Sequence, residues 1–67
     1  MLTVEDVERR VSQIKDTLPD HEKAHGLEDK LYLEVLDCIR DGHTPSPRLL
    51  ADAALKTQEL GINRWYA

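Results

Sequence analysis

The chain has 67 residues, of which 13 are acidic and 9 are basic, so its formal net charge is −4 at pH 7. A chain of this length forms at most one small domain, which argues against an enzyme with a separate substrate domain. An acidic balance without clusters of lysine and arginine argues against nucleic-acid binding. One tryptophan, two tyrosines and no phenylalanine predict a small aliphatic core, so a homodimer would bury additional apolar surface.

The cysteine content and the first residues bear on the compartment. Cys38 is the only cysteine, so no intrachain disulfide can form, which fits a reducing compartment. The start of the chain turns acidic at Glu5 and Asp6 and lacks the basic and apolar regions of a signal peptide. No apolar run is long enough to span a membrane. We therefore expect residues 1–67 to form a single helical domain in the cytoplasm, without membrane association.

The first expected helix runs from about residue 3 to 17. Thr3 is a suitable N-cap, Asp6 stands where a capping box has its acidic residue, and Pro19 ends the segment. Its apolar residues repeat at spacings of three and four, which defines one narrow stripe: Val4, Val7, Val11, Ile14 and Leu18. This stripe is part of the core, the coiled-coil seam of a homodimer, or both. We favour packing within the chain.

The second expected helix runs from about residue 20 to 41, with Asp20 as N-cap and Gly42 after its end. Its apolar residues from Ala24 to Ile39 occupy about half of the circumference. Gly26 lowers the helix propensity of the first turns, so a start nearer Leu27 is the alternative.

The third expected helix runs from about residue 47 to 60, with Ser46 as cap, Pro47 at its first position and Gly61 as its stop. The tail is 62–67. The predicted fold is therefore all-α: a three-helix unit in which the second and third helices form an antiparallel hairpin.

The segment His21-Glu22-Lys23-Ala24-His25 matches the pattern H-E-x-x-H, in which two histidines bind zinc and the glutamate acts as a base. Glu28 or Asp29, three and four residues further on, could supply a third ligand. The motif lies at the start of a helix, and the chain offers no strand to hold a peptide, so hydrolysis is not expected. Solvated or capping side chains are favoured over a metal site made by His21, His25 and Glu28, and no catalytic residue and no cofactor are expected.

Two groups of residues are candidates for contact with a partner. Arg64, Trp65 and Tyr66 are of the types that dominate protein interfaces. The alternative is that Trp65 folds back onto the core. Leu33 and Leu55 each lie off the main apolar face of their helix, which indicates a second apolar surface that either docks the first helix or forms a dimer face.

A resemblance is carried by the sequence Leu27-Glu28-Asp29-Lys30-Leu31-Tyr32, the segment 54–60 and the ending Arg64-Trp65-Tyr66-Ala67. These segments resemble a group of small uncharacterised proteins of bacterial and phage genomes. The resemblance covers the hairpin and the tail but not the first helix. It implies a cytoplasmic accessory protein of a phage, prophage or other mobile element, of the kind that binds and inhibits a host protein.

The function expected from these features is a small non-catalytic module that binds an unidentified host protein and forms a homodimer. A metal-binding protein is one alternative. A weak DNA-binding regulator is another, although Arg48 and Lys56 are the only basic residues of the third helix.

Overall fold

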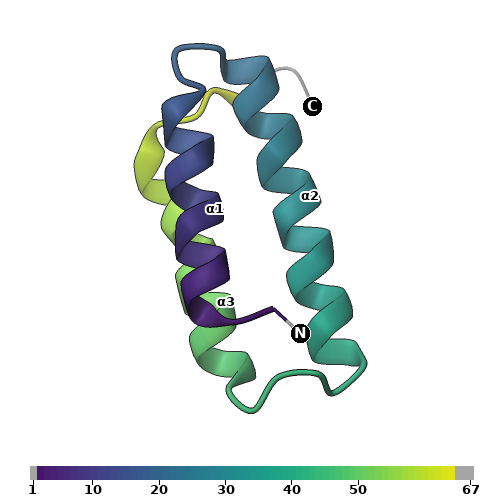
Figure 1. Cartoon of the computed structure of the whole chain (residues 1–67). Helices are drawn as coiled ribbons and strands as arrows, with labels where there is room; N and C mark the ends of the chain where they lie inside the picture. The colour runs from purple at the N-terminus through teal and green to yellow at the C-terminus, as the bar shows by residue number, and fades with distance from the viewer. Residues whose placement is uncertain (1, 65–67) are drawn as a thin grey trace.

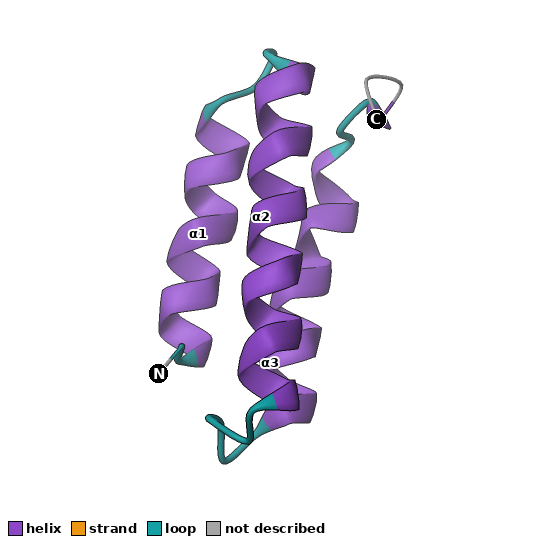
Figure 2. Cartoon of the chain, turned by 90° about the vertical axis from the view of Figure 1, so that its right-hand side faces the viewer, coloured by secondary structure: helices purple, strands orange, loops and turns teal. Residues whose placement is uncertain are grey.

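The structure is a computed structural model that describes residues 2–64. Within this range the chain forms three α-helices and one 3₁₀ helix: α1 (Val4–Asp16), α2 (His21–Arg40), α3 (Pro47–Ala54) and η1 (Leu55–Leu60). α1 and α3 run in one direction and α2 runs in the other, and each helix packs against the other two (Figures 1 and 2). The predicted all-α fold with an antiparallel hairpin of the second and third helices is confirmed.

α1 begins with the predicted capping box. The Thr3 hydroxyl accepts a hydrogen bond from the backbone N–H of Asp6, and the Asp6 carboxylate accepts one from the backbone N–H of Thr3, each at 3.0 Å. These bonds satisfy two of the amide groups that a helix start leaves without partners. An ion pair between Arg10 and Glu34 connects α1 to α2.

α2 begins at His21, so the alternative start near Leu27 is wrong. The Asp20 carboxylate caps the helix by accepting a hydrogen bond from the Lys23 amide at 3.1 Å. His25, in the first turns, is also buried. The cap and this burial outweigh the low helix propensity of Gly26. Beyond the other end, Gly42 has a φ of +70°, in the left-handed region that glycine adopts without strain.

The segment expected as one helix over 47–60 divides into α3 and η1. A 3.6-residue pattern cannot separate an α-helix from a final 3₁₀ stretch, which is common near helix ends. Pro47 occupies the first position as predicted, but the Ser46 side chain makes no capping hydrogen bond. Gly61, with a φ of +69°, is the predicted stop.

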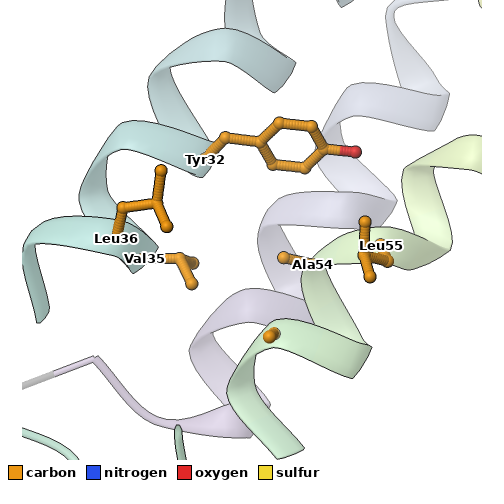
Figure 3. Close-up of a pocket in the computed structure, with 6 residues that line it drawn as sticks. Tyr32, Val35, Leu36, Ala54 and Leu55 are labelled. Atoms are coloured by element: carbon orange, nitrogen blue, oxygen red, sulfur yellow. The ribbon is translucent and has the colours of Figure 1, made fainter. Parts of the chain in front are cut away.

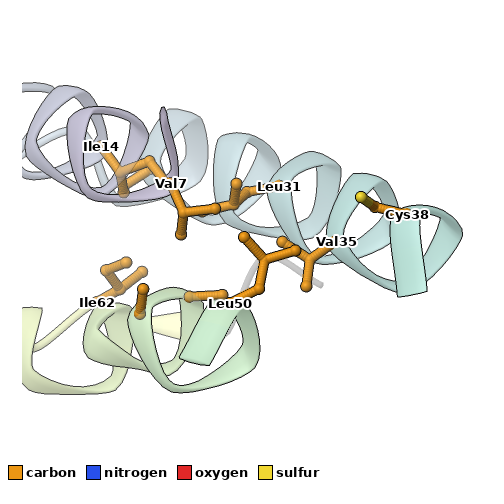
Figure 4. Close-up of a cluster of buried hydrophobic side chains, with 10 residues drawn as sticks. Val7, Ile14, Leu31, Val35, Cys38, Leu50 and Ile62 are labelled. Carbon is orange, nitrogen blue, oxygen red and sulfur yellow. The ribbon is translucent and has the colours of Figure 1, made fainter. Parts of the chain in front are cut away.

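The core is aliphatic, as the composition predicts (Figure 4). It gathers buried side chains from the three α-helices and from the segment after Gly61: Val7, Ile14, Ala24, Leu31, Val35, Cys38, Leu50, Ala53, Ala54 and Ile62. The other members of the α1 stripe, Val4, Val11 and Leu18, are partly buried and pack against this cluster. The structure thus packs the stripe against the core of its own chain.

None of the helices in residues 2–64 combines the length and the apolar character that crossing a membrane requires.

Candidate functional site

An apolar groove lies between α2 and the α3–η1 segment (Figure 3). It encloses about 210 Å³ and is lined by Tyr32, Val35, Leu36, Ala51, Ala54 and Leu55. Val35 and Ala54 are buried, whereas Leu36 is 61% exposed and Leu55 is 56% exposed. Because two of the lining residues are alanines, the α3 side supplies little side-chain volume to fill this space. The groove therefore presents aliphatic carbon to the surroundings.

The hydroxyl of Tyr32 is the one side-chain polar group of this lining, and it is already engaged. It donates to the Glu28 carboxylate at 3.3 Å, shares a hydrogen bond with the Thr57 hydroxyl, and accepts from the Gln58 amide at 3.0 Å. Thr57 is fully buried. The groove consequently suits an apolar side chain rather than a sugar, a nucleotide or an ion, each of which needs polar partners.

Behind Tyr32, Glu28 carries a carboxylate into the interior, where it is only 2% exposed. Arg64 binds both of its oxygens, with Nε to Oε1 at 2.8 Å and Nη2 to Oε2 at 2.7 Å. The same guanidinium donates from Nη1 to the carbonyl oxygen of Ile62 at 3.1 Å. A bidentate ion pair of this kind fixes the orientation of the two side chains as well as pairing their charges. It holds the segment after η1 against the middle of α2.

The ion pair between Glu28 and Arg64 shifts the pKa values of both groups. Hydrogen bonding from Arg64 is the largest influence and lowers the pKa of Glu28, while burial acts in the opposite direction and the hydroxyls of Thr57 and Tyr32 lower it further. The pKa of Arg64 is raised, first by its hydrogen bonds to Glu28. Both groups are therefore charged at neutral pH.

The residues of the H-E-x-x-H segment are brought to the same end of the molecule but not to one point. His21 Nδ1 accepts a hydrogen bond from the backbone N–H of Asn63 at 3.0 Å. His25 Nε2 lies 3.4 Å from an oxygen of Asp29. In the part of the chain that the structure describes, ligand atoms of His25, Glu28 and Asp29 lie within 4.8 Å of one another.

A metal ion at that point would compete with Arg64, because both oxygens of Glu28 already accept hydrogen bonds from the guanidinium. The geometry thus differs from the expected ligand set, since Asp29 stands in the cluster where His21 was expected. The cluster is therefore the ion pair of Glu28 and Arg64, with the side chains of His25 and Asp29 beside it.

The expected partner-binding residues fall into three situations. Arg64 is turned inward to Glu28, with its side chain 33% exposed. Leu55 lines the groove, whereas Leu33 is 64% exposed on α2 and is not part of the lining. Trp65 and Tyr66 lie outside the described residues.

Sequence patterns did not predict three features of this site: the place of Tyr32 in the groove, the place of Leu36 there, and the bond between Glu28 and Arg64. Tyr32 and Leu36 fall within the apolar arc of α2, where the helical period alone predicts burial. The bond between Glu28 and Arg64 joins residues 36 positions apart, and no local pattern relates them. One sequence signal pointed to the exposure of Leu36: it lies three residues from Leu33, so the two leucines are neighbours on the surface of the helix.

No family model matches the sequence, and comparisons with curated proteins and with solved structures give no significant match.

Proposed function

We propose that this protein is a small non-catalytic interaction module that binds another protein through the groove between α2 and α3. The observation that carries the proposal is the groove itself, with two largely exposed leucines on its rim and its one side-chain hydroxyl already bonded inside the molecule. A surface of this kind suits the apolar face of an amphipathic helix, because successive anchors of such a helix enter a groove between two helices.

The resemblance to small bacterial and phage proteins supports a more specific form of the proposal. In that form the module acts in the cytoplasm as an accessory protein of a phage or mobile element, and it inhibits the host protein that it binds.

The test compares three forms of the protein in affinity capture from a bacterial lysate: wild type, Leu55→Glu and Leu49→Glu. Both substitutions replace an exposed leucine on the α3–η1 segment with glutamate, but Leu49 lies outside the groove lining. We expect a captured protein to bind wild type and Leu49→Glu and to lose at least about tenfold in affinity for Leu55→Glu, because a charge would be desolvated against apolar carbon.

Calorimetry with the purified captured protein measures that difference, and circular dichroism checks that the variants are folded. If every captured protein bound Leu55→Glu as tightly as wild type, the groove would not be the binding site.

A further inference from the structure

The face of α2 that points away from the core carries four exposed residues at spacings of four, three and four: Asp29, Leu33, Leu36 and Arg40. We call this set the outer stripe. At 100° per residue its members fall within about 60° of the helix circumference and extend over about 16 Å along the axis. It has the spacing of a coiled-coil seam, but within the described chain neither α1 nor α3 covers it.

The apolar residues of the outer stripe are placed symmetrically about its centre, whereas its two ends carry opposite charges. Two leucines stand at the centre, an acid stands at the N-terminal end and a base stands at the C-terminal end. We infer that the outer stripe docks a second copy of this chain, with the two α2 helices antiparallel about a two-fold axis that passes between Leu33 and Leu36.

In that arrangement Leu33 of one copy faces Leu36 of the other, and Asp29 faces Arg40 of the second copy at both ends. Within its own chain Arg40 pairs with the exposed Asp37 and Asp41, and Asp29 lies 3.4 Å from His25, so the contacts between copies add to these surface pairs or replace them. A two-fold axis makes every contact occur twice, so a single self-complementary stripe suffices. A parallel pair would instead place Asp29 beside Asp29 and Arg40 beside Arg40, which like-charge repulsion disfavours.

The residues beside the outer stripe agree with the antiparallel arrangement. Lys30 and Asp37 are exposed on one flank, and in an antiparallel pair each lies within reach of its opposite charge on the second copy. The other flank is formed by Tyr32, at the edge of the groove. Leu36 belongs both to the outer stripe and to the groove lining, so docking a second copy covers that rim of the groove and leaves Leu55, on the far wall, for another protein.

The inference deepens the proposed function, since it identifies one partner of the interaction module as the module itself. Because the outer stripe has only two leucines per copy, the interface is small and we expect a dissociation constant in the micromolar range.

Sedimentation equilibrium over a series of concentrations tests the inference. We expect the apparent mass of wild type to rise from 7.7 kDa toward twice that value as the concentration increases. Leu33→Glu should remain a monomer, whereas Leu49→Glu, an equal change on an exposed leucine outside the outer stripe, should dimerise as wild type does.

Charge reversal tests the orientation. Asp29→Arg places an arginine opposite Arg40 at both ends of an antiparallel pair, so dimerisation should weaken by roughly tenfold. The double variant Asp29→Arg/Arg40→Asp exchanges the charges and should restore dimerisation to near the wild-type level. In a parallel pair the single reversal would exchange one like-charge contact for another and change little.

A wild type that stays monomeric at high micromolar concentration would overturn the inference, as would dimers that Leu33→Glu leaves intact. A double variant no better than Asp29→Arg would overturn the antiparallel arrangement. None of these results would affect the proposed groove, because that test depends on Leu55, which is not part of the outer stripe.

Discussion

Glu28 stays charged inside the molecule because it forms an ion pair with Arg64. The contribution of this pair to the free energy of unfolding should therefore depend on pH. The pKa of Glu28 is lowered below its ordinary value of 4.5 in the folded protein. The unfolded chain therefore takes up the proton at higher pH than the folded chain does. The contribution of this carboxylate is complete above the unfolded pKa and is lost as the pH falls through the folded pKa.

We expect Glu28→Gln to lower the free energy of unfolding by about 2 kcal/mol at pH 7, because it removes the charge that accepts the two hydrogen bonds from Arg64. Since glutamine does not titrate, the difference between wild type and variant should shrink as the solution is acidified below about pH 4. Urea unfolding at a series of pH values measures it. A difference that stayed constant down to pH 2 would contradict the account of the pair.

The same pair governs whether the neighbouring side chains can hold a metal ion. Because Arg64 occupies both oxygens of Glu28, micromolar zinc should give no heat of binding with the wild-type protein in calorimetry. Arg64→Ala frees the carboxylate beside His25 and Asp29, so this variant should bind zinc more tightly than wild type does. Tight binding by wild type would instead show that zinc displaces the guanidinium.

At the scale of a single helix, Gly26 has the lowest helix propensity of the residues in α2. It is exposed, its φ is not in the left-handed region, and a Cβ built on it meets nothing within 4 Å. Gly26→Ala should therefore raise the free energy of unfolding by roughly 0.5–1 kcal/mol, because alanine loses less backbone entropy on folding. Thermal unfolding in dilute solution measures the change. A lower stability would mean that the glycine has a role beyond the helix itself.

The helices themselves are the part of the fold that local sequence predicts well. Thr3, Asp20, Gly42 and Gly61 each mark a boundary through chemistry that acts over three or four residues, and the structure has boundaries at all four. The 3₁₀ winding of η1 was not predictable in this way. This segment has only two apolar residues, Leu55 and Leu60, five positions apart, so its sequence contains no apolar period that could distinguish a 3₁₀ helix from an α-helix.

At the scale of the whole molecule, the candidate site depends on where helices meet, and single-helix patterns do not contain that information. Leu36 and Val35 lie in the same apolar arc of α2, yet one is exposed and the other buried, because Ala51 and Ala54 on α3 leave the groove open. The sequence indicated that Leu55 belongs to a second apolar surface. It did not indicate that Tyr32 and Leu36 form the opposite wall.

The long sequence distance between Glu28 and Arg64 has a consequence for the order of events during synthesis. Thirty-six positions separate the two residues, so the whole of α2 has been synthesised before the arginine is added to the chain. Until then the carboxylate lacks its ion-pair partner and stays hydrated, which opposes its burial. Glu28 gains the two hydrogen bonds that accompany its burial only after the segment that follows η1 has been made.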